Sequence, residues 1–216
     1  MPKIVDRDER RNEIISAYLG LVNEKGFDAV TTRVLTKHLG VSTGSLWNYF
    51  ESQIELVEEA FRKTFEEQRQ RLAKIADTNR GLSALSGFVL EVLPLTASGQ
   101  DDARTMIEFW QKGPQFERQF STVQAESEGE WASWARRFLH EAIEDGDVNP
   151  ALDADLLADI LVVLLDGLQM QYTMQTSFGS LEELDRVAVS AVSMWLTEQG
   201  RDHLSRIRSS QSRVLK

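Results

Sequence analysis

The sequence predicts an all-α protein. Apolar residues recur at helical spacing along most of the chain, and we find no alternating apolar and polar run that would indicate a β-strand. Proline is scarce, and its four residues stand at positions 2, 94, 114 and 150, where they delimit or kink helices. An apolar fraction of 42% is sufficient for a buried core.

The periodicity and its interruptions divide the chain into nine expected helices. The first has an apolar stripe and ends at Gly26, where glycine supplies the left-handed position after the last turn. Ser180 and Glu183 form a capping-box pattern before the last one. The stripe of the first helix consists of Ile14, Ile15, Tyr18, Leu19 and Val22. The expected helices are residues 7–25, 32–39, 43–49, 52–77, 80–97, 102–112, 115–145, 153–177 and 180–198.

Charge is distributed unevenly. The formal net charge of −10 resolves into zero over residues 1–53, −14 over residues 54–200 and +4 over residues 201–216. An acidic body repels DNA phosphates, so a contact with nucleic acid has to come from the amino-terminal end. For the middle of the chain, the simpler interpretation is that an acidic surface keeps the protein in solution.

No membrane or secretory segment is expected. The amino terminus is polar, and the longest apolar run, residues 160–165, is far shorter than the roughly 20 residues that span a bilayer. The chain has no cysteine, which excludes disulfides and thiolate chemistry and fits a reducing compartment. We therefore expect a cytoplasmic protein with no membrane partner.

The residue patterns of enzymes are missing. The three histidines are His38, His140 and His203, and none follows a glutamate at the spacing of a di-iron bundle. HExxH, GxSxG and GxxxxGK[ST] motifs do not occur. We expect a protein that is not an enzyme, with no catalytic residue, no metal site and no cofactor.

Residues 27–53 have the pattern of a helix-turn-helix. Thr31 or Thr32 caps a short helix, Gly40 permits a sharp turn, and Ser42 or Thr43 caps a second helix. Leu46 and Phe50 face inward at i, i+4, with Val41 between the helices. Small, hydroxyl, amide and aromatic residues remain on the outer face, and these suit contacts with DNA. An ordinary helical hairpin is the alternative.

Arg11 to Phe61 resemble the DNA-binding domain of the tetracycline-repressor (TetR) family. The resemblance rests on a first helix ending in Gly-Phe, a threonine-initiated helix, Gly-Val-Ser, an aromatic-x-aromatic-Phe cluster and a long following helix. It implies operator contacts by a defined set of residues. These are Thr32, Arg33, Thr43, Gly44, Ser45, Trp47, Asn48, Tyr49 and Gln53.

Two features modify that expectation. Gln53 stands where the family usually has a phosphate-binding lysine, so one cationic contact per subunit is in doubt. Lys3, Arg7, Arg10 and Arg11 could form a basic arm along DNA or could simply be solvated.

The rest of the chain resembles the carboxy-terminal domain of the choline-responsive BetI branch, mainly through GDVNP and LDGL within residues 103–171. This similarity concerns the fold and not the ligand. We expect a DNA-binding domain over residues 8–68, an effector-binding and dimerisation domain over 69–200, and a basic, flexible tail over 201–216.

Two late helices are predicted to form the dimer interface, because their apolar bands are wide. The alternative is that they belong to the core of one subunit. A single helix-turn-helix reads too few base pairs, which favours a homodimer. The bands are Leu157, Ile160, Leu161, Leu164, Leu165 and Leu168, then Leu184, Val187, Ala188, Ala191, Val192, Trp195 and Leu196.

Aromatic residues and methionines gather on the helices that would line the family's pocket. An aromatic face attracts a cation and a carboxylate neutralises it, which predicts an apolar or cationic aromatic effector. Each residue could equally be ordinary core. The candidates are Phe88, Glu108, Phe109, Trp110, Trp131, Trp134, Asp166, Gln169, Met170 and Met174.

These expectations combine into one predicted function. The protein is a ligand-responsive transcriptional regulator, a repressor that binds a palindromic operator in double-stranded DNA as a dimer and is released by a small-molecule effector. An activator, or a regulator that needs no ligand, is the alternative.

Overall fold

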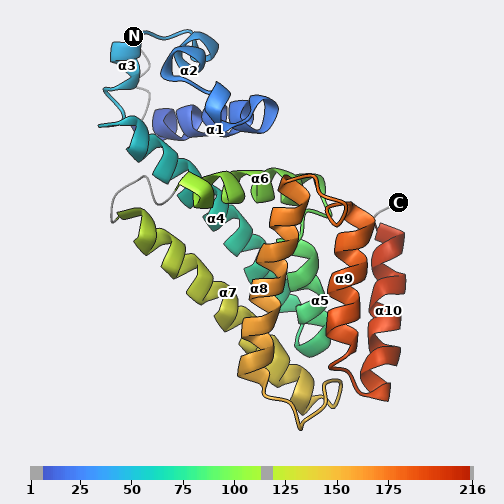
Figure 1. Cartoon of the computed structure of the whole chain (residues 1–216). Coiled ribbons are helices and arrows are strands. Elements are labelled where there is room, and N and C mark those ends of the chain that lie inside the picture. Colours follow the sequence, from blue (N-terminus) through green and yellow to red (C-terminus); the bar gives the residue numbers. More distant parts are fainter. Residues whose placement is uncertain (1–6, 113–118, 215–216) are drawn as a thin grey trace. The chain divides into compact units, whose positions relative to one another are not determined.

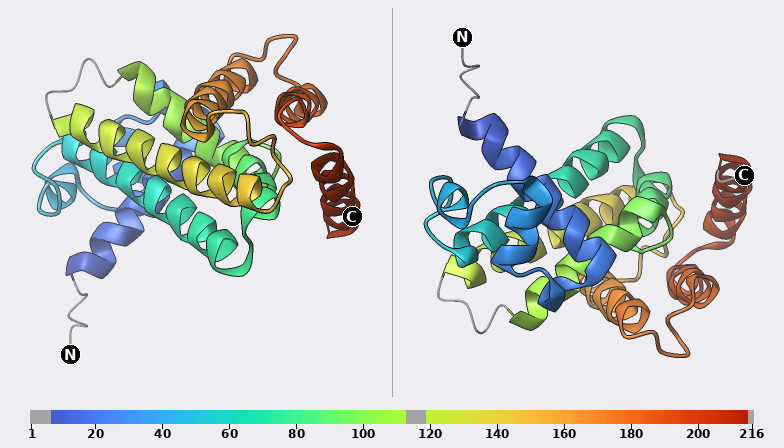
Figure 2. Two further views of the ribbon diagram at one scale, coloured as in Figure 1. Left: turned by 90° about the horizontal axis from the view of Figure 1, so that it is seen from below. Right: turned by 90° about the horizontal axis from the view of Figure 1, so that it is seen from above.

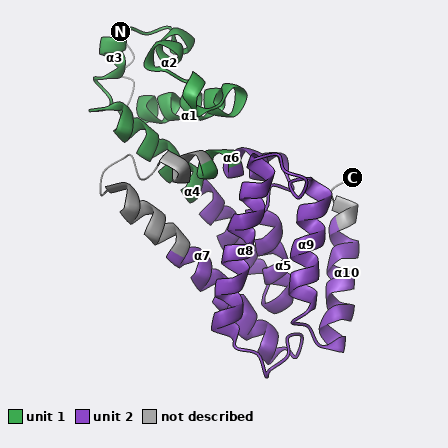
Figure 3. Ribbon diagram, in the orientation of Figure 1, with its two compact units in different colours: residues 1–66, 104–123 green, residues 67–103, 124–216 purple. Residues whose placement is uncertain are grey.

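The structure is a computed structural model that describes residues 7–112 and 119–214, with side chains over 7–107 and 129–211. In this part of the chain all regular elements are helical, as predicted (Figure 1). The chain divides into two compact units, residues 1–66 with 104–123 and residues 67–103 with 124–216 (Figure 3). α4 (Gln53–Thr78) is a continuous helix that contributes residues to both.

Unit 1 is organised around its first helix. Four of the five residues of the predicted stripe are buried and Leu19 is half-buried, so the stripe is confirmed as core. Gly26, with φ of 80°, follows the last turn as predicted. The elements are α1 (Arg7–Lys25), the 3₁₀ turn η1 (Phe27–Ala29), α2 (Thr32–Leu39), α3 (Thr43–Leu46) and the first part of α4.

Unit 2 contains the remainder of α4 and six further helices or parts of helices. Its core is formed by leucine, alanine and aromatic side chains of these helices, among them Leu85, Phe88, Phe138 and Leu161. The helices are α5 (Gly81–Val92), α6 (Ala97–Lys112), α7 (Gln119–Glu144), α8 (Ala154–Thr173), α9 (Leu181–Ser193) and α10 (Glu198–Val214).

Several helices are shorter than predicted. The helix expected over residues 80–97 stops at Val92, because Pro94 forces the preceding Leu93 into an extended conformation with ψ of 148°. The helix expected over 153–177 ends at Thr173, shortly before Gln175 with φ of 53°. The recognition helix expected over 43–49 ends at Leu46 and continues as a turn.

The predicted flexible tail from residue 201 is wrong over its described part, which is helix α10. Leu204 is buried and Ile207 half-buried, so the Ser/Arg-rich segment has one apolar face. A Cβ on Gly200 would lie 2.0 Å from the Asp147 carbonyl oxygen, so glycine allows this close approach. α9 and α10 form one edge of the unit (Figure 2). α10 also contacts α5.

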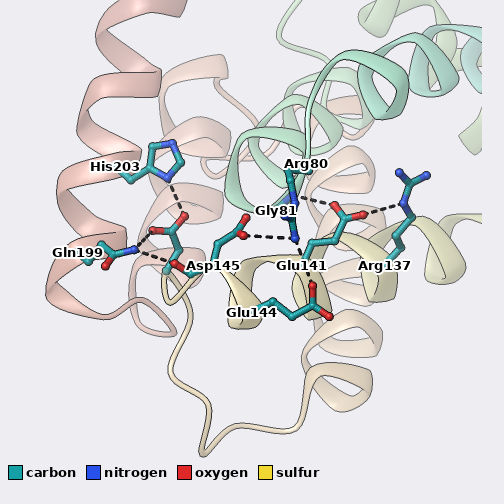
Figure 4. Close-up of polar contacts among 9 residues, drawn as sticks. Arg80, Gly81, Arg137, Glu141, Glu144, Asp145, Gln199 and His203 are labelled. Atoms are coloured by element: carbon teal, nitrogen blue, oxygen red, sulfur yellow. Dashed lines mark hydrogen bonds and ion pairs between the residues drawn. The ribbon is translucent and has the colours of Figure 1, made fainter.

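A polar network joins the start of α5, the end of α7 and the start of α10 (Figure 4). The Glu141 carboxylate accepts the Gly81 N–H at 2.9 Å, which satisfies an N–H of the first turn of α5. His203 contacts the buried Asp147 carboxylate at 2.6 Å, and Gln199 donates to the Asp145 carbonyl at 2.8 Å. The carboxy-terminal helix is therefore held by specific contacts as well as by apolar packing.

Within the described residues, no single helix is both long and apolar enough to span a bilayer, although α5 and the first part of α6, bent by 65°, pass that test as a pair.

Candidate DNA interface and candidate effector site

The two short helices of unit 1 begin and turn as the sequence predicts. The Thr31 hydroxyl accepts the Val34 N–H at 3.3 Å, and the Ser42 hydroxyl accepts the Ser45 N–H at 3.1 Å. Between the helices, Gly40 adopts the left-handed conformation with φ of 67°. Hydroxyl caps at both amino termini and one glycine at the turn thus fix the local geometry of the helix-turn-helix.

One face of this motif is buried. Leu35, Leu46 and Phe50 are buried, and Val41 is half-buried between the helices. Thr36 is also buried, and its hydroxyl donates to the Thr32 carbonyl at 2.9 Å. The inward positions of Leu46 and Phe50 are confirmed.

All nine predicted DNA-contacting residues are at least partly exposed. Because α3 ends at Leu46, the residues that follow it are presented by a turn rather than by a helix. Arg33, Thr43, Gly44, Asn48 and Gln53 are exposed, whereas Thr32, Ser45, Trp47 and Tyr49 are half-buried.

A surface hollow brings part of this set together. It has a volume of about 310 Å³ and lies where the start of α2 meets the first residue of α4. Thr32, Arg33 and Gln53 line it together with Phe27, Asp28, Val30 and Thr31. A cation, a hydroxyl and an amide around one hollow make a suitable surface for a phosphate or a base edge.

Arg11 acts inside unit 1, a role that the sequence does not reveal. Its guanidinium donates to the Tyr49 carbonyl, pairs with Glu55 at 2.9 Å and lies 4.5 Å from the centre of the Phe50 ring. Neither alternative, an arm along DNA or a solvated cation, describes Arg11, which instead holds the turn after α3. Arg10 pairs with Glu13 at 2.5 Å, Arg7 is exposed, and Lys3 lies outside the described residues.

The Glu55 carboxyl is held in its charged form. Burial raises its pKa, but hydrogen bonds from the Glu51 N–H and from Arg11 outweigh burial, so the pKa is lower than its ordinary value. The Glu55 carboxylate therefore remains available to Arg11, and their contact supports the turn that carries Trp47, Asn48 and Tyr49.

The effector candidates fall into separate groups. Phe88, Trp131 and Gln169 are buried inside unit 2, and Trp134 and Asp166 are half-buried. The structure does not place Met170 and Met174 with them, because both are exposed, the second to 61%. Glu108, Phe109 and Trp110 lie outside the side chains that the structure describes.

An aromatic cluster and a buried amide occupy the interior of unit 2. The Phe138 ring centre lies 6.3 Å from that of Phe88 and 5.7 Å from that of Trp134. The Gln169 side chain donates to the Val92 carbonyl at 2.8 Å across α8 and α5. Gln68 on α4 is also buried, and the sequence indicates this only through its position four residues before the apolar Leu72.

An exposed apolar stripe, which we call the α8 stripe, runs along one side of α8. The spacing of its members, mostly three, four or seven residues, keeps them on one helical face. They are Leu156, Ile160, Val163, Met170 and Met174, with Gly167 in open space between them.

Most residues of the two predicted apolar bands belong to the core of one subunit, which was the alternative to a dimer interface. Leu157, Leu161, Leu165 and Leu168 are buried within the subunit, as are Leu184, Ala188, Val192, Trp195 and Leu196. Of the named residues of α8, Ile160 is the exposed one. A helix that is apolar on most sides has one apolar face in the subunit core and another that is exposed. Sequence periodicity alone does not distinguish the two faces.

No group of three or more His, Asp or Glu side chains suited to a metal ion occurs among the described residues.

This arrangement defines a class of protein, a helix-turn-helix transcriptional regulator with a separate helical domain. Residues 14–60 match the family described as "Bacterial regulatory proteins, tetR family", and residues 82–197 match "BetI-type transcriptional repressor, C-terminal". The chain belongs to the TetR family and has a BetI-type carboxy-terminal domain. The family consists of DNA-binding transcriptional regulators and not of enzymes.

Relatives and solved structures agree with this assignment. The chain is 25% identical over 202 residues to the HTH-type transcriptional regulator PksA of Bacillus subtilis, covering 94% of this chain and 97% of that protein. It is 25% identical over 211 residues to BetI of Serratia proteamaculans, with 94% and 98% covered. A putative regulator from Saccharomonospora viridis in complex with choline has the same fold, with a TM-score of 0.81, 19% identity, and 88% and 99% of the two chains covered.

Proposed function

We propose that this regulator is a repressor that binds a palindromic operator as a homodimer and is released by a small-molecule effector. The α8 stripe is the observation that carries the proposal. A contiguous apolar surface of this kind is unfavourable in water, and a second copy of the same helix would cover it.

The DNA contacts come from the exposed face of the helix-turn-helix. In this proposal Arg33 and Thr32 contact DNA beside the hollow at the start of α4, and the first turn of α3 enters the major groove. Thr43 and Gly44 are exposed there and small enough to permit close approach. The remaining contacts are made by Ser45, Trp47, Asn48, Tyr49 and Gln53.

The dimer gives the operator its symmetry. Two recognition elements have to lie about 34 Å apart, or a multiple of that distance, to enter successive major grooves. An effector that binds better to a form with another separation lowers DNA affinity by its differential affinity, typically about 1–3 kcal/mol.

The effector occupies the interior of unit 2, beside the aromatic cluster of Phe88, Trp134 and Phe138. The choline complex of the related fold supports a small molecule in a domain of this type. The sequence predicts an apolar or cationic aromatic compound for this position.

Val163→Glu tests the dimer. Val163 is 70% exposed, so the substitution leaves the fold of one subunit intact. In a homodimer it places a charge in a desolvated interface, which costs roughly 3–5 kcal/mol and should raise the dimer dissociation constant by about 100-fold or more. We expect monomers by light scattering, unchanged helicity by circular dichroism and no operator shift in a gel.

Ser133→Glu is the matched control, because it adds the same charge at an exposed position of α7. It should remain dimeric and bind the operator. A dimeric Val163→Glu variant would show that the α8 stripe is not the interface, and a monomeric variant with normal operator affinity would refute the need for a dimer.

A further inference from the structure

Three polar atoms, each on an almost completely buried side chain of unit 2, have no hydrogen-bond partner among the described residues. They are Gln68 Oε1 on α4, Trp131 Nε1 on α7 and Gln169 Oε1 on α8. The three residues are only 1%, 3% and 1% exposed. A buried polar group without a partner costs about 1–3 kcal/mol, so such a group calls for an explanation.

The orientation of the Gln169 amide follows from its chemistry. Its Nε2 donates to the Val92 carbonyl, which can only accept, so its Oε1 is the atom left over. Trp131 offers an N–H donor and nothing else. These three atoms are therefore two carbonyl acceptors and one indole donor, all uncharged.

Helix registers place the three atoms at one level of the unit. α4 and α5 run antiparallel, since Arg71 contacts Glu91 at 2.5 Å and a Cβ on Gly87 would meet Ile75. Continuing that register sets Gln68 level with the carboxyl end of α5, just beyond Val92.

The same level is reached from the other two helices. α5 and α7 are also antiparallel, because Gly81 bonds Glu141 and Phe88 lies against Phe138. One further turn along this register sets Val92 level with Trp134, and Trp131 lies three residues, less than one turn, farther along α7. Gln169 lies at the level of Val92 because its side chain donates to the Val92 carbonyl. The aromatic cluster of Phe88, Trp134 and Phe138 lies next to this level.

We propose that these three atoms select an effector that is uncharged, with an apolar body and a polar end that carries two donors and one acceptor. A primary carboxamide is the smallest group with that set. This rests on the proposed effector role of unit 2. A quaternary ammonium has neither an N–H for the two glutamine oxygens nor an acceptor for the indole, so it would leave all three atoms unsatisfied.

Benzamide, N,N-dimethylbenzamide and choline are the probes, titrated calorimetrically into the whole chain of residues 1–216. Benzamide should bind, and the dimethyl compound, which lacks both donors, should bind at least about tenfold more weakly. No heat with benzamide, or tighter binding of choline, would overturn the proposal.

Gln68→Met removes one acceptor and keeps the side-chain length. It should weaken benzamide about three- to tenfold, the loss of one hydrogen bond. Gln70→Met, at an exposed position of the same helix, is the matched control and should not change benzamide affinity. Equal benzamide affinity in Gln68→Met and wild type would refute a role for Gln68.

Thermal unfolding without any ligand gives an independent result. If Gln68 Oε1 has no hydrogen-bond partner in the absence of ligand, Gln68→Met removes an unsatisfied polar group. The melting temperature of this variant should then stay level or rise by about a few degrees. A fall would show that the glutamine is satisfied within the apo protein, by a buried water for example, and would refute the proposal. An operator gel shift on the same wild-type sample distinguishes the two possible failures. If the proposed repressor function is wrong, the protein does not bind the operator; if only the ligand proposal is wrong, operator binding remains.

Discussion

Individual side chains of unit 1 have roles that their residue type alone does not reveal. Arg33 and Arg11 are both cations near the helix-turn-helix, but Arg33 is exposed and lines the hollow, whereas Arg11 is directed to Tyr49, Phe50 and Glu55. The difference lies in what the fold places beside each guanidinium. Arg33 is therefore the better candidate for DNA, and Arg11 for the integrity of the turn.

Arg33→Ala should weaken operator binding about tenfold or more, because one specific arginine contact is worth about 1–3 kcal/mol. Helicity and dimerisation should not change, since the side chain is exposed. Gel shift and circular dichroism measure the two effects. Lys25→Ala removes the same charge at an exposed position of α1 and serves as control. Wild-type affinity in Arg33→Ala would remove this residue from the interface.

Among the helices of unit 2, one ion cluster connects three elements. Arg71 on α4 contacts Glu91 on α5 and Asp102 on α6. Burial of Asp102 raises its pKa to about 6, since the attraction of Arg71 does not fully compensate for desolvation and for the nearby Glu91 and Glu67. The contact therefore includes a group that titrates close to neutral pH.

Stability should depend on pH through Asp102. The unfolded carboxyl titrates near 3.9 and the folded one near 6, so between these values the folded state binds more protons and stability falls as pH rises. Relative to Asp102→Asn, wild type should gain on the order of 2 kcal/mol on going from pH 7 to pH 4. Melting curves across this range, with the neighbouring exposed Asp101→Asn as control, measure the difference. If the stability of wild type and of Asp102→Asn changed in the same way with pH, the raised pKa of Asp102 would be contradicted.

For the molecule as a whole, the charge distribution limits how DNA is bound. The first 53 residues are neutral in sum and residues 54–200 carry −14, so few cations are available to replace counterions on DNA. Gln53, exposed at the start of α4, removes the cation that the family usually has there. Operator affinity should therefore depend only weakly on salt.

Gln53→Lys should tighten binding to all DNA sequences and steepen the salt dependence by about 0.9 per subunit, because one more phosphate is neutralised. A cation at the first turn of α4 opposes the helix dipole, so stability should fall by about 0.3–1 kcal/mol. Fluorescence anisotropy over a salt series measures the slope. Gln70→Lys, exposed farther along α4, should leave it unchanged, and the same slope in Gln53→Lys and wild type would disprove the contact.

The features that the sequence alone predicted correctly depend on residues that are close together in the chain. Threonine and serine caps, Gly40 and the inward Leu46 and Phe50 determined the helix-turn-helix, because capping and i, i+4 packing depend on residues close in the chain. The regular apolar periodicity likewise determined the all-α fold. The family followed from the same local motifs.

Tertiary structure alone decided which apolar faces are covered and which polar atoms are satisfied. α8 is apolar on most of its sides, so only the packed subunit shows that Leu161 and Leu165 are buried while Val163 and Met174 are exposed. The segment after residue 200 forms a helix because Leu204 is buried against other helices of unit 2. Gln68 is a site candidate because the registers of α4, α5 and α7 place it close to other buried polar atoms without partners. Burial and hydrogen bonding depend on residues distant in the chain, and one sequence does not reveal those neighbours.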